Sequence, residues 1–234
     1  MSIKKIIKEE ILRILKESVE EAEDWWNTTP ERLFELSEHD DFKVRKAVAG
    51  NFNSPPEILL KLSGDTNDGV RKNVARNINC PPEALIKLSG DTNDYVRSLV
   101  AGNTNTPPEI LIKLSGDTKW IVRMGVASNR NAPPEILLKL SGDTKDGVRH
   151  FVALNLNSPP EALWKLSGDT DKLVRDNVAG NINCPIKALL ILIKDPEPEV
   201  RESAKNNPRY KQYLEDVDRA ALKARDELED ALFD

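Results

Sequence analysis

Apolar and polar residues recur along this chain with a period of 26 residues, and the frame never slips. In most periods, leucines spaced by three follow a pair of prolines, and valines spaced by four come later. Both spacings place apolar side chains on one face of a helix. The sequence therefore predicts an all-α fold, an α-solenoid of seven helical-pair repeats. The period is marked by Pro55, Pro81, Pro107, Pro133, Pro159 and Pro185, and by Arg45, Arg71, Arg97, Arg123, Arg149, Arg175 and Arg201.

The first helix of each repeat is predicted to begin at the proline pair and to end before a glycine. In one copy, Ser54 is expected to cap the helix, Pro55 to occupy its first position, and Glu57 to complete a capping box. The helix would run to Ser63, and Gly64 would supply a left-handed terminus. A Glu57–Lys61 ion pair is expected one turn apart. The apolar stripe consists of Leu59 and Leu62, Leu85 and Leu88, Leu111 and Leu114, Leu137 and Leu140, and Leu163 and Leu166.

The second helix, residues 68–76 in the same copy, separates constant positions from variable ones. Val70, Arg71, Val74 and Ala75 fill one arc of the helical wheel and barely change between copies, so this arc should be packed. The opposite arc changes in every copy and should face solvent. It comprises positions 68, 69, 72, 73 and 76 and their equivalents.

The repeated segment Val-Arg-x-x-Val-Ala-x-Asn, followed by Pro-Pro-Glu-x-Leu-x-x-Leu-x-x-Asp, resembles the leucine-rich repeat variant family of short HEAT-like repeats. The resemblance covers about residues 29–208. It implies a right-handed superhelix of α-helices alternating with shorter, partly 3₁₀ helices. It also implies a scaffold without enzymatic activity. Some members carry an iron–sulfur domain, but its cysteine cluster is missing here, so no cofactor is expected.

The repeated arginines could in principle follow a phosphate backbone. An aspartate recurs six residues before each arginine from Arg71 to Arg201, however, so an internal Asp–Arg ladder is the simpler interpretation. Residues 29–210 contain 25 basic and 24 acidic residues, which argues against a nucleic-acid partner. The repeated asparagines are expected to bond backbone groups in the turns. These two sets are Asp65, Asp91, Asp117, Asp143, Asp169 and Asp195, and Asn77, Asn103, Asn129, Asn155 and Asn181.

Both ends of the chain predict amphipathic helices that cap the repeats. The expected division is a capping helix in 1–28, the repeats in 29–210 and a second capping helix in 211–234. Alternatively, either helix recruits a partner or dimerises. Trp25 and Trp26 are expected to pack at the first junction. The apolar faces comprise Ile3, Ile7, Ile11 and Ile14, and Tyr210, Leu214, Val217, Ala221, Leu228 and Leu232.

The variable arc becomes apolar in three adjacent middle copies, whereas the second and sixth copies are mainly polar there. Clustered aromatic, aliphatic and methionine side chains are typical of protein-binding hot spots. We therefore predict a protein or peptide partner on the concave face. The alternative is that these side chains only pack between neighbouring helices. The predicted site consists of Tyr95, Leu99, Trp120, Ile121, Met124, His150, Phe151 and Leu154.

Two other functions use the same residues. A base-modifying, nucleic-acid-binding protein would need Trp120 and Tyr95 with a carboxylate, either Asp94 or Asp146. No basic cleft accompanies them, and the chain has no phosphate-binding or nucleophile motif, so we expect no enzyme. Self-assembly through the apolar surface is the other alternative.

Composition predicts a cytoplasmic protein without a membrane span. The 234 residues are 31% charged, carry a net charge of −5 and contain no long apolar run, and charged residues from Lys8 onward interrupt any signal peptide. Cys80 and Cys184 occupy the same repeat position four copies apart. Stacked layers advance about 8–10 Å each, so no disulfide is expected. With His39 and His150 they show no metal-ligand spacing.

Overall fold

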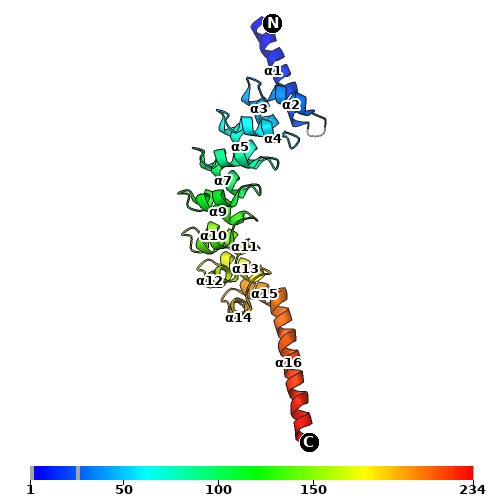
Figure 1. Cartoon of the computed structure of the whole chain (residues 1–234), viewed down its shortest axis with the longest axis vertical. Helices are drawn as coiled ribbons and strands as arrows, with labels where there is room; N and C mark the ends of the chain where they lie inside the picture. Colours follow the sequence, from blue (N-terminus) through cyan, green and yellow to red (C-terminus); the bar gives the residue numbers. More distant parts are fainter. Residues whose placement is uncertain (1–2, 25–26, 234) are drawn as a thin grey trace. The chain divides into compact units, whose positions relative to one another are not determined.

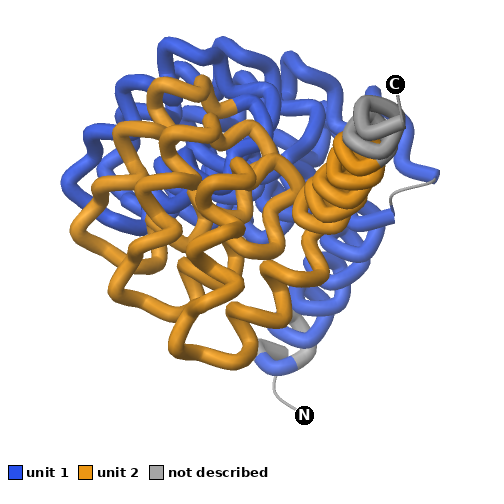
Figure 2. Tube along the Cα trace, turned by 90° about the horizontal axis from the view of Figure 1, so that it is seen from below, with its two compact units in different colours: residues 1–131 blue, residues 132–234 orange. Residues whose placement is uncertain are grey.

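The computed structural model describes residues 3–24 and 27–233, which form α-helices and no strand. It contains two compact units, residues 1–131 and residues 132–234 (Figure 2). The first unit holds helices α1 to α9 and the second holds α10 to α16. Each unit is a stack of helical pairs, so the predicted all-α solenoid is confirmed.

Each repeat contributes a seven-residue helix, here called an A helix, and a nine-residue B helix. The A helices are α2 (Pro30–Leu36), α4 (Pro56–Leu62), α6 (Pro82–Leu88), α8 (Pro108–Leu114), α10 (Pro134–Leu140), α12 (Pro160–Leu166) and α14 (Ile186–Leu192). The B helices are α3 (Phe42–Gly50), α5 (Asp68–Arg76), α7 (Asp94–Gly102), α9 (Trp120–Ser128), α11 (Asp146–Leu154), α13 (Lys172–Gly180) and α15 (Pro198–Asn206). Longer helices flank them, α1 (Ile3–Glu23) and α16 (Pro208–Phe233).

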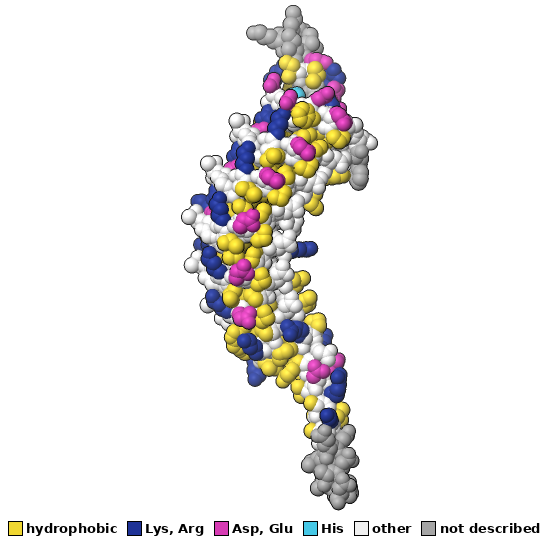
Figure 3. All heavy atoms as spheres, viewed as in Figure 1, with side chains coloured by type: hydrophobic (Ala, Val, Ile, Leu, Met, Phe, Trp, Pro, Cys, Tyr) yellow, Lys and Arg dark blue, Asp and Glu magenta, His cyan; other side chains and the backbone are white. Residues whose placement is uncertain are grey.

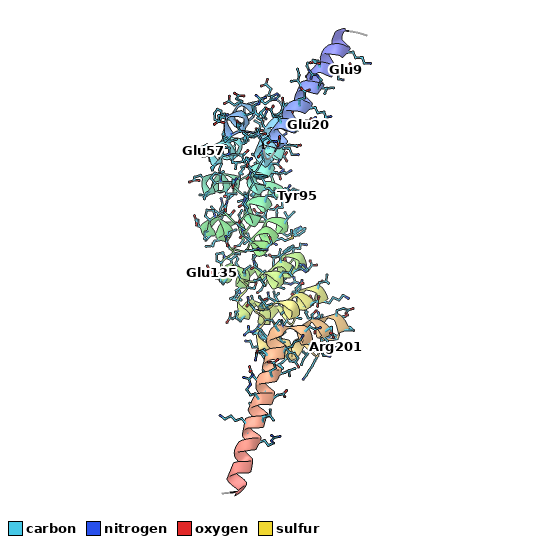
Figure 4. All side chains as sticks on the ribbon, turned by 90° about the vertical axis from the view of Figure 1, so that its right-hand side faces the viewer. Glu9, Glu20, Glu57, Tyr95, Glu135 and Arg201 are labelled. Carbon is cyan, nitrogen blue, oxygen red and sulfur yellow. The ribbon has the colours of Figure 1, made fainter. Side chains whose placement is uncertain are left out.

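A and B helices form two layers within each unit. In the first unit, α3, α5, α7 and α9 pack one on the next (Figure 1). Glu57 on α4 and Tyr95 on α7 point to opposite sides (Figure 4). In the second unit, α11, α13 and α15 pack in order, as do α10, α12 and α14. Glu135 and Arg201 point to opposite sides there.

The core lies between the two layers and is built from the constant positions. In the second helical pair, Leu59 and Leu62 of α4 meet solvent hardly at all, and Val70 and Val74 of α5 are fully buried. Burying one such side chain contributes about 1.5–3 kcal/mol. The packed arc predicted for the B helices is thus confirmed, and the bounds predicted for residues 68–76 are those of α5.

The predicted start of the A helices is wrong by one residue. Helix α4 begins at Pro56, with Pro55 in extended conformation before it, and no side chain caps it. The Ser54 hydroxyl instead donates to the Val48 carbonyl at 2.6 Å, and Glu57 completes no capping box. A proline at the first helical position has no N–H to satisfy, so a side-chain cap is less needed.

The left-handed terminus predicted at Gly64 is also wrong, since no described glycine has a positive φ. Ser63 is in right-handed conformation, and the amides of Gly64 and Asp65 donate to Lys61 and Leu62 at 3.1 and 3.0 Å. The chain therefore leaves the A helix through a right-handed turn. Lys61 pairs with Glu38 of the preceding repeat at 2.7 Å, not with Glu57 as expected.

The shorter helices are α-helical, although the family resemblance implied a partly 3₁₀ character. In α4, the Leu59 amide donates to the Pro55 carbonyl at 3.2 Å and the Ser63 amide to Leu59 at 2.9 Å. These are bonds to the fourth residue back, as in an α-helix. All A helices described are seven residues long, so each provides barely two turns.

A long helix flanks the repeats at each end of the described chain. Helix α1 packs on α2 and α3, with Arg32 pairing to Glu21 at 2.9 Å and Asn51 donating to the Ala22 carbonyl at 2.9 Å. Helix α16 packs on α14 and α15. Trp25 and Trp26 lie outside the described residues. The three-part division at residues 28 and 210 stays a prediction.

Candidate binding surface

Arginine side chains tie neighbouring repeats together inside the stack. Arg71 donates from Nε and Nη2 to the two carboxylate oxygens of Asp91, at 2.6 and 3.0 Å. Its Nη1 also donates to the carbonyls of Asp65 and Thr66 at 2.9 and 3.1 Å. The hydrogen bond to Asp91 raises the pKa of Arg71. Equivalent pairs are Arg45–Asp65 and Arg97–Asp117 in the first unit, and Arg149–Asp169 and Arg175–Asp195 in the second.

These paired arginines confirm the predicted Asp–Arg ladder and correct its register. Arg71 binds the carboxylate of the following repeat and the backbone carbonyl of the aspartate in its own repeat. The Arg71 side chain is 15% exposed and that of Asp91 is 6% exposed. A guanidinium with its donors directed into the protein has little left for a phosphate. The repeated arginines are therefore part of the scaffold.

The repeated asparagines form a second ladder that reaches backward along the chain. Asn77 Nδ2 donates to the carbonyls of Ala49 and Asn51 in the preceding repeat, at 3.0 and 2.9 Å. Its Oδ1 accepts from the Asn79 amide at 2.9 Å. The predicted backbone-bonding role is confirmed, and the structure adds that the bonds join two repeats. Asn103 and Asn181 repeat the arrangement.

With the scaffold accounted for, the variable arc of the B helices is the candidate binding surface. Five of the predicted site residues lie in the first unit, on α7 and α9, and three lie on α11 in the second unit. Tyr95, Trp120 and Leu154 are 57%, 44% and 46% exposed. The remaining five are partly exposed, namely Leu99, Ile121, Met124, His150 and Phe151.

In the first unit, three predicted residues line one groove across α5, α7 and α9. The groove has a volume of about 340 Å³, with Leu99, Ile121 and Met124 among its lining residues. The other lining residues are mostly small, and Arg76 is the charged one among them. The full lining is Ala75, Arg76, Ser98, Leu99, Gly102, Asn103, Ile121, Met124, Gly125 and Ser128.

Gly125 lets α9 approach α7 closely at this groove. A Cβ atom on Gly125 would lie 2.6 Å from the Ser98 carbonyl oxygen and 2.9 Å from the Ala101 Cβ. The equivalent positions in neighbouring copies carry larger side chains, Leu99 and Phe151. The missing side chain leaves room between Leu99 and Met124, so the groove depends on this glycine.

The predicted residues on α11 are held by contacts within the second unit. His150 Nδ1 lies 2.8 Å from Asn177 Nδ2 on the next B helix. The rings of His150 and Phe151 meet edge to face, with centroids 5.5 Å apart and planes at 75°. These two side chains therefore serve packing at least in part, whereas Leu154 extends into solvent.

Tyr95 and the two carboxylates of the catalytic alternative have ordinary surroundings. Lys72 Nζ lies 5.5 Å from the centroid of the Tyr95 ring and pairs with Asp68 at 3.0 Å. Asp94 and Asp146 are the first residues of α7 and α11. A carboxylate at a helix N-terminus interacts favourably with the helix dipole, which accounts for both.

Sequence reasoning missed a second exposed apolar set, the A-helix column. It follows the buried leucine of each A helix and appears as yellow atoms beside magenta ones in each unit (Figure 3). Comparing the copies could have revealed it, because this position is apolar in each A helix. Lys61 covers the Phe34 ring at 5.1 Å, and Lys187 covers the Trp164 ring at 4.8 Å. The column comprises Phe34, Leu60, Ile86 and Ile112 in the first unit, and Leu138, Trp164 and Leu190 in the second.

The two cysteines are buried free thiols, each one residue before the proline that is the N-cap of its A helix, Pro81 or Pro185. Cys80 and Cys184 are both 0% exposed, and burial raises the pKa of each thiol to about 12. A thiol that stays protonated is a poor nucleophile.

In the described part of the chain, none of the helices is long and apolar enough to cross a membrane.

Comparison with solved structures supports the predicted resemblance. The chain is similar to a leucine-rich repeat variant with a novel repetitive structural motif, at 29% identity and a TM-score of 0.57, over 81% of this chain and 80% of that one. An engineered protein matches at 22% identity and a TM-score of 0.43, covering 80% of this chain and 71% of that chain. A designed armadillo repeat protein in complex with the peptide (KR)4 matches at 16% and 0.31, covering 85% and 91%.

The first of these similarities confirms the resemblance in fold, and the chain is a helical repeat protein similar to a leucine-rich repeat variant. The two weaker similarities have TM-scores below 0.5, so no conclusion about this chain is drawn from them. No family model matches the chain, and a comparison with curated proteins also found no match.

Proposed function

We propose that this protein is a non-catalytic binding scaffold that takes an apolar segment of a protein or peptide on the variable surface of α7 and α9. The observation that supports it best is the groove lined by Leu99, Ile121 and Met124. The exposed rings of Tyr95 and Trp120 lie on the same two helices. Exposed aromatic and aliphatic groups around a groove are typical of interaction sites.

The chemistry of the groove suggests what the partner presents. Its lining combines leucine, isoleucine and methionine with glycine, alanine and serine, which suits a leucine, methionine or phenylalanine side chain. Arg76 also lines it and is exposed. An acidic residue near the apolar anchor would find its counter-charge there. His150, Phe151 and Leu154 would provide a separate apolar contact in the second unit.

The proposal can be tested with substitutions that other copies of the repeat already carry. Asn73 stands in α5 where α7 has Leu99, and Lys72 stands where α9 has Met124. The double variant Leu99→Asn/Met124→Lys should therefore fold while losing the apolar groove. Ile112→Lys on α8 is the matched control, because it adds a lysine in place of an exposed aliphatic side chain in the same unit.

Immobilised intact protein and both variants would be incubated with a peptide display library, and the affinity of selected peptides measured by fluorescence anisotropy. We expect peptides with an apolar anchor that bind the intact chain and Ile112→Lys equally and bind the double variant at least about 10-fold more weakly. Nuclease-treated pull-downs with the same three proteins would test natural partners. Equal binding by all three, or recovery lost after nuclease treatment, would contradict the proposal.

A further inference from the structure

A second groove lies in the layer of A helices of the first unit, on the side to which Glu57 points (Figure 4). Its volume is about 540 Å³. Phe34 is 53% exposed there, although Lys61 lies over its ring, and Ile58 beneath the surface is 2% exposed. The groove therefore offers an apolar side chain a place between α2 and α4. Its lining consists of Pro30, Glu31, Phe34, Glu35, Pro55, Glu57 and Ile58.

The charged residues that line this groove are all acidic. Glu31, Glu35 and Glu57 are exposed at its edge. Glu35 accepts a hydrogen bond from Arg32 at 2.8 Å. Within the described part of the chain, the carboxylates of Glu31 and Glu57 have neither a hydrogen-bond nor an ion-pair partner. The groove on α7 and α9 differs, because Arg76 is the charged residue there.

Glu35 distinguishes this place from its equivalents in the later repeats. A glutamate in the first turn recurs in most A helices and suits the helix dipole, so by itself it indicates no site. One turn later, five of the other A helices carry a lysine that offsets this charge, whereas α2 carries a second glutamate. Acidic charge therefore accumulates at the groove of α2 and α4. The five lysines are Lys61, Lys87, Lys113, Lys139 and Lys165.

The cations beside the groove are engaged by carboxylates of the chain itself. Arg32 donates from Nε and Nη2 to Glu21, both at 2.9 Å, in addition to its bond to Glu35. Lys61 pairs with Glu38 at 2.7 Å. Glu21 and Glu38 lie outside the groove lining. The charge of the lining carboxylates is thus left largely uncompensated.

From the apolar lining and its acidic edge we infer that the groove of α2 and α4 binds a basic peptide segment of another protein. An apolar side chain of the segment lies against Phe34 and Ile58, and lysine or arginine residues beside it meet Glu31 and Glu57. The same charges repel the phosphates of a nucleic acid. This segment is opposite in charge to the one proposed for the groove of α7 and α9.

The role of charge is tested with the full chain and a display library of random peptides, followed by fluorescence anisotropy of the enriched peptides. The variant Glu31→Gln/Glu57→Gln removes two charges of the groove. Glu83→Gln/Glu109→Gln is the matched control, because it changes the same repeat position on α6 and α8. We expect peptides in which lysine or arginine flanks an apolar residue, bound about 5-fold or more weakly by the first variant and normally by the control.

The apolar anchor is tested with Phe34→Ala. Its matched control is Ile112→Ala, because Ile112 occupies the equivalent position of α8 and is 48% exposed. The first substitution should weaken binding of the basic peptides about 10-fold, and the second should leave it unchanged. Circular dichroism checks that each variant is folded. Raising the salt concentration from about 0.05 to 0.5 M should weaken binding to the intact chain as well.

Three results would overturn the inference: no enrichment of basic peptides, equal weakening by both double variants, or a dimer of the chain that Glu31→Gln/Glu57→Gln abolishes. In the last case the groove would hold a second copy, which analytical ultracentrifugation detects. The variant Leu99→Asn/Met124→Lys should still bind the basic peptides, because its changes lie on α7 and α9. A failure of one groove is therefore distinguishable from a failure of the other.

Discussion

Each B helix has two surfaces, one whose residues are nearly the same in all copies of the repeat and one whose residues differ between copies. In α5 and α9, the valine, arginine and alanine of the packed arc are the same, while Lys72 and Asn73 of α5 correspond to Met124 and Gly125 of α9. The constant residues make contacts that both neighbouring repeats require. The variable residues make contacts that differ from repeat to repeat, such as the hydrogen bond from Asn73 Nδ2 to the Lys46 carbonyl. The comparison teaches that the scaffold tolerates changes of surface chemistry from one repeat to the next.

The broadest way to break the scaffold is acid, because it acts on every Asp–Arg pair together. Burial raises the pKa of Asp91, but hydrogen bonds from Arg71 and the Asn93 amide outweigh it, so the pKa lies below its usual range. At Asp195 the hydrogen bond from Arg175 is the largest influence and lowers the pKa. The pKa values of Asp65, Asp117 and Asp169 are lowered as well.

A lowered folded-state pKa means that the stabilisation is complete above the unfolded value of about 4 and is lost as pH falls through the folded value. We therefore expect the urea midpoint to be flat above about pH 5 and to fall steeply below about pH 4. Urea unfolding followed by circular dichroism between pH 3 and 7 measures this. A midpoint that does not change down to pH 3 would contradict a stabilising role of the ladder.

Arg71→Met removes one guanidinium and keeps an apolar stem. Asp91 then loses its partner while it remains buried, so the free energy of unfolding should fall by about 3 kcal/mol. The control is Arg13→Met on α1, where an exposed arginine pairs with Glu10 and Glu17. That change should cost less than about 1 kcal/mol. Chemical denaturation of both variants would separate the scaffold pair from the surface pair.

Asn77→Ala removes three hydrogen bonds to backbone groups of two repeats. The Ala49 carbonyl loses this donor and the Asn51 carbonyl keeps only the Ser54 amide, so a loss of about 2–3 kcal/mol is expected. Asn105→Ala serves as the comparison, since Asn105 is exposed and donates to the Ile78 carbonyl at 2.7 Å. It should cost less than about 1 kcal/mol. Similar losses in both variants would mean that burial is not what makes the asparagine ladder important.

Gly125→Ala tests the close packing of α9 on α7, where a variable-arc position contacts the neighbouring B helix. The new methyl group would meet the Ser98 carbonyl and force α9 away from α7, at a cost of about 1–3 kcal/mol. Gly180→Ala, at the end of α13, meets nothing within 4 Å and should stabilise by about 0.5–1 kcal/mol. Thermal denaturation of the two variants should therefore shift in opposite directions.

Trp120→Ala should have the smallest effect on stability, because the ring is 44% exposed and belongs to the variable arc. A loss below about 1 kcal/mol is expected. Val126→Ala on the same helix should cost about 2 kcal/mol, since Val126 is fully buried. If Trp120→Ala were as destabilising as Val126→Ala, the apolar side chains of the middle copies would be packing residues and the comparison would fail.

Much of the fold could be predicted because the copies can be compared with one another. The bounds of α5 and its buried valines follow from periodicity alone. The termini of the A helices could not be predicted from residue preferences. Ser54 uses its hydroxyl on the Val48 carbonyl of the preceding helix, and Gly64 continues a right-handed turn. In both cases the tertiary environment outweighs the local preference of the residue.

The residues of the candidate site could be predicted from the sequence, but the groove that some of them line could not. Tyr95, Leu99, Trp120, Ile121 and Met124 were identifiable as a set because the same arc is mainly polar in the second and sixth copies. The groove was not, because it depends on how near α9 comes to α7 at Gly125. A missing side chain leaves no periodic signal of its own.

By itself the sequence determined the repeat, the two helices in it and the division into constant and variable positions, because a 26-residue period constrains every copy alike. Only the tertiary structure decided the partners. Arg71 binds the aspartate 20 residues onward, and Asn77 reaches back to the preceding repeat. Hydrogen bonds depend on distances of a fraction of an ångström, and those distances exist only once neighbouring repeats have stacked.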